Sequence, residues 1–374
     1  MKRQWVWCML LAGCVTALSA CKSTSEGAKQ EIAEIGFDKE SVSEQTMKTE
    51  KPEETNDIQS TEANRTSKGY PKIQVKGSVK KFDGTIQIAD TAYELYNYVE
   101  SSAKQYATVV NTISKKLGSS VDVYDMIVPT SVGITLPDNQ KKKVNSSDQK
   151  KSIRKIYNKL HSGIRTVSLY ETLMQHRTEY IYFRTDHHWT DLGAYYAYKQ
   201  FCEDEGITPH ARKDYTKKNF GGYYGSFYQD THQSKTLKKD KVIAYYPVDQ
   251  KKITMKYTDD GGNTYSSPVI CDASSYGTLL KYCAFIAGDN PYTVIKNKAV
   301  HDGSSCVIVK ESFGNAFAPY LADHYQTIYV IDYRYWDGSL SKLVKQKKVQ
   351  DVLFLNNISM TRNAYLIGKL AQLH

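Results

Sequence analysis

The chain has 374 residues and a formal net charge of +10, with 40% hydrophobic and 24% charged residues. This apolar content supports a folded core and excludes a largely disordered chain. The mean hydropathy is −0.54, and apolar runs beyond the N-terminus stay well short of the roughly 20 residues that span a bilayer, which excludes a polytopic membrane protein. The positive charge alone is compatible with nucleic acid, an acidic polymer or an anionic membrane surface as a partner.

Residues 1–20 are predicted to be an export signal. A short basic start precedes an apolar stretch of about 14 residues, which fits the apolar region of a signal peptide. The stretch ends in the sequence LSAC, whose last residue is Cys21. This ending resembles the lipobox of bacterial lipoproteins, which implies that Cys21 is lipidated and becomes the mature N-terminus. A signal peptide followed by a chance cysteine is the alternative. A lipid on Cys21 predicts an extracytoplasmic, membrane-anchored protein with no nucleic-acid partner.

Residues 21–69 are predicted to be a disordered tether. Residues 22–69 contain one phenylalanine, no tyrosine or tryptophan, and a net charge of −4. Such a segment cannot bury enough apolar surface to offset its loss of entropy on ordering, although a helical stalk around residues 29–35 is an alternative. All 30 tyrosines lie in residues 70–374, which we expect to be the folded domain. Its net charge of +12 suits an anionic envelope polymer or a membrane face, or is a solvated lysine surface.

The folded domain alternates between predicted strands and helices. Thr190 is the expected N-cap of a helix that starts at Asp191. Residues 220–282 are rich in glycine, tyrosine and lysine, and we expect hairpins and loops inserted into the domain there. Helical crossovers between consecutive strands build a mainly parallel sheet covered on both faces. The expected strands span residues 121–128, 166–169, 180–183, 306–309, 327–331 and 349–355, and the expected helical segments span residues 91–117, 147–161, 191–203, 315–324, 340–346 and 362–370.

Polar residues follow many of the predicted strands. In open α/β sheets, ligands bind beyond the carboxyl ends of the strands. We therefore expect these residues to gather at one rim of the sheet. They are residues 129–131, residues 186–188, Ser312, Arg334, Asn356 and Asn357.

A carboxylate and two imidazoles lie in the sequence TDHHW at residues 185–189. In an extended segment, residues two apart face the same side, so we expect Asp186 to face His188 while His187 points away. A carboxylate beside an imidazole fixes its tautomer and stabilises the imidazolium that forms when it accepts a proton. His188 is therefore the candidate general base. A metal site formed by all three residues, or histidines without a role, are the alternatives.

Ser312 is the candidate nucleophile. It lies at the step from an apolar strand into a helix, within the sequence KESFGN. A hydroxyl there projects at the sheet edge, where amides at the start of the helix can stabilise an oxyanion. The position resembles a nucleophile elbow, but the sequence around Ser312 does not match the GxSxG motif of that turn. A serine that only caps the helix is the alternative.

These two segments together resemble the signature of the DHHW family of bacterial exported proteins, over about residues 75–370. That family is similar to the SGNH-hydrolase-like polysaccharide O-acetyltransferases, including the alginate O-acetylation proteins. The resemblance implies a three-layer α/β/α fold, Ser312 as nucleophile, Asp186 and His188 as the base pair, and Arg334 near the substrate. Further matching segments are residues 127–130, 221–228, 287–290, 307–321 and 331–335.

The sequence departs from the relatives in ways that matter for the site. In ordinary SGNH esterases the serine comes first along the chain, and two residues separate the aspartate from the histidine. Here the aspartate and the histidine precede the serine, and only one residue separates them. The serine block carries Glu311 where an aspartate is common, which leaves the contacts of that acid open. Asn290 is a candidate oxyanion donor by analogy with the asparagine of SGNH enzymes, or a plain turn residue. The aromatic run at residues 220–228 could stack on sugar rings or only pack a loop.

Four cysteines remain in the folded domain, and none has zinc-site spacing. A Cys271–Cys283 disulfide is allowed, and Cys306 is expected to be buried in its strand. The fourth is Cys202.

The chain is expected to be an extracytoplasmic lipoprotein that transfers or hydrolyses acyl groups on a cell-envelope polysaccharide. It would act as an O-acetyltransferase or an O-acetyl esterase through Ser312, His188 and Asp186. No metal or soluble cofactor is implied. The expected partners are the polysaccharide, the membrane through the lipid anchor, and a membrane protein as a candidate acyl donor. A non-catalytic, glycan-binding envelope protein is the alternative function.

Overall fold

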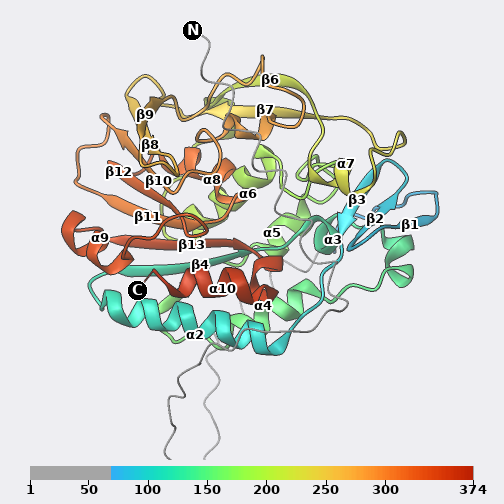
Figure 1. Ribbon diagram of the computed structural model, residues 1–374, viewed down its shortest axis with the longest axis horizontal. Helices are drawn as coiled ribbons and strands as arrows, with labels where there is room; N and C mark the ends of the chain where they lie inside the picture. The colour runs from blue at the N-terminus through green and yellow to red at the C-terminus, as the bar shows by residue number, and fades with distance from the viewer. Residues whose placement is uncertain (1–68, 374) are drawn as a thin grey trace, which may run out of the picture. The chain divides into compact units, whose positions relative to one another are not determined.

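The computed structural model describes residues 69–373. The predicted export signal, the lipidation site at Cys21 and the predicted tether up to residue 68 lie outside these residues. Among the described residues, no helix is both long enough and apolar enough to cross a membrane. Helices pack on both faces of a central sheet, as the three-layer prediction requires (Figure 1).

The central sheet has eight strands in the order β5-β4-β13-β11-β12-β10-β8-β9. The strands from β5 to β12 are parallel to their neighbours, whereas β10, β8 and β9 are each antiparallel to the strand before them. The sheet is therefore mixed, and the prediction of a mainly parallel sheet is wrong for its last three strands. The strands are β4 (Asp122–Val128), β5 (Ile164–Thr166), β8 (Ile253–Thr258), β9 (Thr264–Ser267), β10 (Tyr292–Asn297), β11 (Ser305–Lys310), β12 (Thr327–Asp332) and β13 (Asp351–Asn357).

Both faces of the sheet are buried at its centre, and β11 shows this most clearly. All six of its residues are buried, and they alternate between two separate apolar cores: Cys306 and Ile308 belong to one, and Val307 and Val309 to the other. This is why the strand is a continuous apolar run in sequence. One core is covered by α5 (Tyr170–Gln175), α6 (Asp191–Asp204) and α8 (Gly314–Leu321), and the other by α2 (Glu100–Leu117), α4 (Gln149–Tyr157), α9 (Leu340–Lys347) and α10 (Ala364–Ala371).

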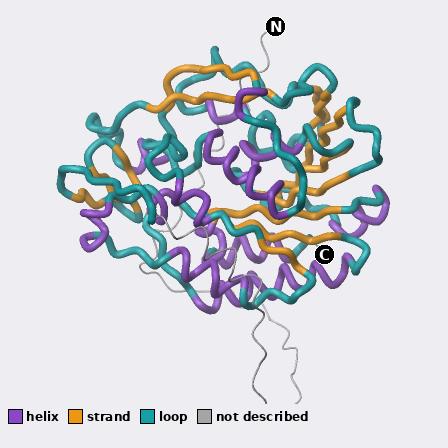
Figure 2. The backbone as a smooth tube through the Cα atoms, turned by 180° about the vertical axis from the view of Figure 1, so that it is seen from behind, coloured by secondary structure: helices purple, strands orange, loops and turns teal. Residues whose placement is uncertain are grey.

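The segment that was expected to be an insertion of hairpins divides into two parts. Strands β6 (Thr216–Tyr223) and β7 (Asp240–Tyr246) pair as a separate hairpin, which Figure 2 shows at the top, apart from the strands of the main sheet. Between them lies the short helix α7 (Ser226–Asp230). Strands β8 and β9, by contrast, extend the main sheet at its antiparallel edge. Only the β6–β7 hairpin is therefore separate from the central sheet, whereas β8 and β9 belong to it.

Two other expectations about local structure need correction. The amphipathic stretch at residues 91–117 divides into β3 (Thr91–Glu94), which pairs with β2 (Thr85–Ile88) and through it with β1 (Val79–Lys81), and the helix α2. The strand expected at residues 180–183 is only a single bridge between Tyr182 and Trp189.

The cysteines of the described domain form no disulfide with one another. Cys202, Cys271 and Cys306 are buried and free. The disulfide between Cys271 and Cys283, which the sequence allows, is therefore not formed here. The burial expected for Cys306 is confirmed.

Candidate active site

Two distant segments of chain meet beyond the carboxyl end of β11. Ser312 lies between β11 and α8, and residues 184–188 form a bend that leads to α6. Thr190 caps α6 through Gly193, as predicted. Trp189 joins the two segments, because its buried indole donates a hydrogen bond to the Phe313 carbonyl at 3.0 Å. The tryptophan of the TDHHW sequence thus fixes the serine turn against the acid–base pair.

Asp186, His188 and Ser312 form one hydrogen-bonded chain. His188 Nδ1 lies 2.5 Å from Asp186 Oδ1, and His188 Nε2 lies 2.7 Å from Ser312 Oγ. The backbone amide of His188 also donates to Asp186 Oδ1 at 2.9 Å. All three side chains are buried. A carboxylate on Nδ1 leaves Nε2 as the acceptor that faces the serine hydroxyl, which is the arrangement of a serine nucleophile with its base.

The segment that carries the acid and the imidazoles is a bend and not the extended segment assumed from sequence. Asp240 organises it, since its Oδ2 accepts hydrogen bonds from the amides of Arg184 and Thr185 at 2.9 and 2.7 Å. The pairing of Asp186 with His188 survives this difference. The expectation that His187 points away is wrong, because the bend brings the centroid of its ring to 3.9 Å from the centroid of the His188 ring.

The Asp186 carboxylate is held from a second side. Its Oδ2 accepts a hydrogen bond from the Ser226 amide at 2.9 Å. Burial alone would raise the pKa of Asp186, but His188 and His187 outweigh burial and hold that pKa well below its usual range. The backbone of Gly225 approaches so closely that a β-carbon there would overlap the Asp186 side chain. Glycine is therefore required at position 225 by space, and the acid stays ionised at neutral pH.

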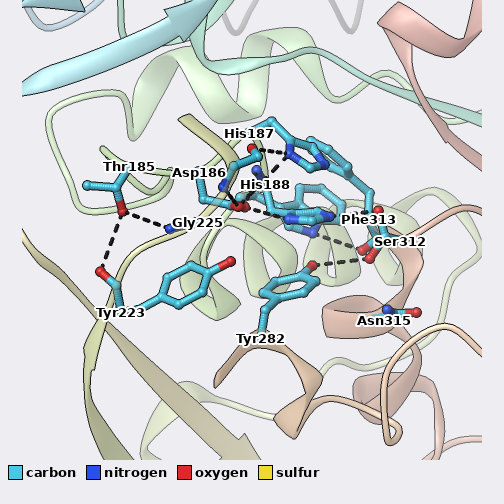
Figure 3. Close-up of polar contacts among 12 residues, drawn as sticks. Thr185, Asp186, His187, His188, Tyr223, Gly225, Tyr282, Ser312, Phe313 and Asn315 are labelled. Carbon is cyan, nitrogen blue, oxygen red and sulfur yellow. Dashed lines mark hydrogen bonds and ion pairs between the residues drawn. The ribbon is translucent and has the colours of Figure 1, made fainter. Parts of the chain in front are cut away.

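The imidazole of His188 lies between two other rings. Tyr282 stacks on it with ring centroids 4.0 Å apart and planes 13° apart, and His187 covers the opposite face (Figure 3). The Tyr282 hydroxyl donates to the Ser312 carbonyl at 3.2 Å. Burial, followed by the nearby Asp186 carboxylate, raises the pKa of Tyr282 well above its usual value, so the phenol remains a donor. Sequence reasoning missed Tyr282, because no local pattern separates it from the many other tyrosines.

Glu311 folds back on the serine turn. Its Oε2 accepts a hydrogen bond from the Phe313 amide at 3.2 Å and lies 3.3 Å from Ser312 Oγ. Its Oε1 accepts from the Asn357 amide at 2.9 Å, which ties the turn to the end of β13. Burial raises the pKa of Glu311. The glutamate at position 311, where an aspartate is common in the relatives, thus contacts the serine turn and the end of β13.

Arg334 belongs to a charged cluster at the same rim. It binds Asp332 through Nε and Nη2 at 2.8 and 2.6 Å, and Nη2 also lies 2.9 Å from Asp289. Lys310 bridges the same two carboxylates at 2.8 and 3.2 Å. Asn315 in α8 donates to Asp289 at 2.8 Å and links the cluster to the serine turn. The side chain of Arg334 is 20% exposed and that of Lys310 is fully buried, so Arg334 is the cation of this cluster that solvent reaches.

A sequence model of the DHHW protein family matches residues 63–331. The chain belongs to the DHHW family. A crystal structure of a DHHW family protein from Eubacterium siraeum is 29% identical, with a TM-score of 0.72 over 79% of this chain and 97% of its own. Bacillus cereus PatB1, solved with a sulfonyl adduct, is 17% identical, with a TM-score of 0.65 over 78% of this chain and 99% of its own. None of the curated proteins matches the sequence. The resemblance stated from the sequence is confirmed, and the likeness to PatB1 extends to the fold.

Asn290 of this DHHW protein lies in a turn. Its side-chain amide donates to the Ala287 carbonyl at 3.3 Å. Asn290 lies shortly before β10. Ile286 and Ala287 have φ values of 45° and 60°, and this left-handed backbone turns the chain after the short 3-10 helix at Lys281–Ala284. Among the described residues, Asn290 has no hydrogen bond to Ser312 or His188.

The other rim residues of this DHHW protein support the fold. The Pro129 carbonyl accepts from the Tyr182 hydroxyl, and Thr130 accepts from Gln149 at 2.7 Å. Asn356 donates to the buried Tyr106 hydroxyl at 3.4 Å. They gather at the predicted rim, but their contacts are with scaffold residues.

The aromatic run of the DHHW protein packs against itself. Tyr224 and Tyr228 stack with centroids 4.0 Å apart, and the Lys239 ammonium lies 5.2 Å from the centre of the Tyr224 ring. Tyr224 thus already has two partners. This arrangement favours loop packing over sugar stacking for that ring.

Asp186, His187 and His188 also have donor atoms within 4.8 Å of one another, as a metal site would require. Two ligands of one tetrahedral zinc ion at about 2.0 Å would lie about 3.3 Å apart. The 2.5 Å between His188 Nδ1 and Asp186 Oδ1 is instead a hydrogen-bond distance. Nδ1 of His187 is engaged by Ser226 Oγ at 2.7 Å. The three side chains as arranged fit an acid–base pair better than a metal centre.

Proposed function

We propose that this DHHW protein is an extracytoplasmic enzyme that transfers or hydrolyses acyl groups on a cell-envelope polysaccharide. It would act as an O-acetyltransferase or an O-acetyl esterase. The observation that carries the proposal is the hydrogen-bonded chain from Asp186 through His188 to Ser312, with distances of 2.5 and 2.7 Å. A serine hydroxyl is a weak nucleophile until an adjacent base accepts its proton, and this geometry supplies that base.

In the first half of the reaction, Ser312 Oγ attacks the ester carbonyl carbon and its proton passes to His188 Nε2. The Asp186 carboxylate stabilises the imidazolium that results. The tetrahedral intermediate collapses, and His188 gives the proton to the departing alcohol oxygen. In the second half, a sugar hydroxyl or water gives its proton to His188 and attacks the acyl carbon. The proton then returns to Ser312 Oγ as the ester bond to the enzyme breaks.

The negative charge on the carbonyl oxygen needs donors at the serine turn. The Ser312 amide is one candidate, since no group among the described residues accepts a hydrogen bond from it. The side-chain amide of Asn290 is a second candidate donor to this oxygen, but it would first have to break its hydrogen bond to the Ala287 carbonyl. Arg334 is the candidate contact for the polysaccharide or its acyl group, because it is the solvent-exposed cation of its cluster.

We further propose that Cys21 carries the lipid and that residues 22–69 tether the domain to the membrane. A flexible chain of this length would reach about 40 Å. That reach would allow the domain to meet both an acyl donor in the membrane and a polymer outside it. The net charge of +12 on residues 70–374 suits an anionic envelope polymer.

Trapping of an acyl-serine tests the proposal against a non-catalytic glycan-binding role. The mature protein is incubated with 4-nitrophenyl acetate, quenched in acid and examined by intact mass and peptide mapping. We expect one acetyl group on Ser312 and none in a Ser312→Ala variant. A protein that releases no 4-nitrophenol above the Ser312→Ala background, and acquires no acetyl group, would be a binding protein.

A further inference from the structure

His187 lies at the reacting serine but has no place in the mechanism above. Its ring covers the face of His188 opposite Tyr282, with centroids 3.9 Å apart (Figure 3). The ring of Phe313, the residue after the nucleophile, lies 6.1 Å from it. The side chain of His187 is 35% exposed, whereas those of Asp186 and His188 are 4% and 8% exposed. Among these three side chains, His187 is the one that a molecule entering from solvent can touch.

One nitrogen of His187 is fixed and the other is available. Nδ1 forms a hydrogen bond with Ser226 Oγ at 2.7 Å, and the Ser226 amide in turn holds Asp186 at 2.9 Å. Nε2 has no hydrogen-bond partner among the described residues. Ser226 thus orients an imidazole whose free nitrogen can bond to a ligand in front of the nucleophile.

The surroundings of His187 favour its neutral form, chiefly through burial. Burial, followed by the neighbouring His188, lowers the pKa of His187, although Asp186, Glu94 and Glu311 oppose this. A neutral imidazole can be a hydrogen-bond donor or acceptor, depending on its tautomer. A hydroxyl group is both, so it is the ligand that a neutral Nε2 accommodates in either tautomer.

We propose that His187 Nε2 binds the hydroxyl group of the acceptor alcohol and so directs acyl-Ser312 toward transfer instead of hydrolysis. This inference rests on the proposed function. The acceptor class is a polyol, such as a sugar. The acceptor O–H proton goes to His188 Nε2, the acceptor oxygen forms the new ester bond, and the bond between the acyl carbon and Ser312 Oγ breaks. His188 then returns the proton to Ser312, and His187 neither gains nor loses one.

Product partitioning tests this role without depending on the rate of acylation. The full-length protein is given 4-nitrophenyl acetate as donor and glycerol as a polyol acceptor, and acetate and glyceryl acetate are quantified. Both products come from the same acetyl-Ser312, so their ratio reports only how the acyl group leaves. A hydrogen bond of ordinary strength predicts that His187→Ala lowers the ratio of glyceryl acetate to acetate about three- to tenfold.

Three variants separate binding from a structural role. His187→Gln, which keeps a donor and an acceptor, should retain part of the ratio. Ser226→Ala, which frees Nδ1, should lower it less than His187→Ala does. His301→Ala makes the same change at an exposed histidine near the start of β11, the end opposite Ser312, and should leave the ratio at the wild-type value. Melting curves identify any variant that is merely unfolded.

The outcomes distinguish this inference from the function on which it rests. An unchanged ratio in His187→Ala, with acetyl-Ser312 still formed, would overturn the role of His187 and leave the proposed function standing. A wild-type protein that releases only acetate at molar glycerol would do the same. Absence of acetyl-Ser312 would refute both.

Discussion

His188 is held on its edges and on both its faces. Asp186 and Ser312 bind its two nitrogens, and Tyr282 and His187 cover its faces. A ring held in this way has lost its rotational freedom before a substrate arrives, so little ordering is left for the reaction itself. Precise placement of catalytic groups contributes strongly to rate. The two residues over the faces are therefore positioning residues, which hold the ring and transfer no proton.

Ester hydrolysis should depend on His188 and Ser312 to a similar extent. Base catalysis contributes typically about 10²–10⁴-fold, so His188→Ala should lower kcat/KM for 4-nitrophenyl acetate by about that factor, and Ser312→Ala by a similar one. The double variant should be little worse, because residues that act as a unit are not additive. His187→Ala should cost far less. Equal losses from both histidines, together with sensitivity to a chelator, would favour the metal site instead.

At the scale of elements, the bend at residues 184–188 shows what a local pattern can and cannot predict. The residue types, the position of Ser312 after an apolar strand and the resemblance to the DHHW family together predicted the Asp186–His188 pair and its meeting with the serine. The direction of His187 was not predictable, because Asp240 shapes the bend from 55 positions away along the chain. The same reason hid Tyr282, which reaches His188 only through the tertiary fold.

The sheet shows the same limit. Strands β11, β12 and β13 were predictable because burial on both faces makes each one a continuous apolar run between helices. Strand β10 escaped prediction, since only two of its six residues, Val294 and Ile295, are aliphatic. Strand β9 is polar and mostly exposed. Strand β8 alternates apolar and polar residues, but only one of its six residues is fully buried, so neither strand has the continuous apolar run that marks the centre of the sheet.

The contact between α7 and the acid gives a prediction at this scale. Gly225, directly before α7, leaves no room for a β-carbon against Asp186. Gly225→Ala should push the carboxylate away from His188 and lower kcat/KM, by roughly 10²-fold if the displacement is near 1 Å. Gly277→Ala is the matched control, because a β-carbon there meets no atom. Esterase kinetics on both variants check this, and equal activity would show that the loop yields without moving the acid.

For the whole molecule, the predicted anchor can be tested in cells. Cys21→Ser removes the thiol to which the lipid would be attached, so the protein should leave the membrane fraction or keep its signal peptide. Cys14→Ser alters a cysteine inside the predicted signal and should not change the location. Membrane fractionation and intact mass measure the outcome. If Cys21→Ser stays membrane-bound with the mass otherwise unchanged, the lipobox interpretation is wrong.

The stability of the described domain should fall with rising pH because of a carboxyl group in the core. Asp125 on β4 is fully buried, one of its oxygens has no partner in the described structure, and the other accepts from Tyr106 at 2.5 Å. Burial raises the pKa of Asp125 to about 7, against the effect of Tyr106. The folded state therefore binds this proton more tightly than the unfolded state does. The resulting stabilisation is complete below about pH 4 and is lost as the pH rises through about 7.

Asp125→Asn removes this titration and keeps a side chain that can accept from Tyr106. Between pH 5 and pH 8, the free energy of unfolding of the wild type should fall by about 2–3 kcal/mol relative to the variant. Asp125→Asn should therefore gain on the wild type as the pH rises. Asp122→Asn, at an exposed acid of the same strand, should follow the wild-type profile. Urea unfolding monitored by tryptophan fluorescence measures all three proteins, and parallel pH profiles for the wild type and Asp125→Asn would mean that this carboxyl group has the same proton affinity in the folded and unfolded states.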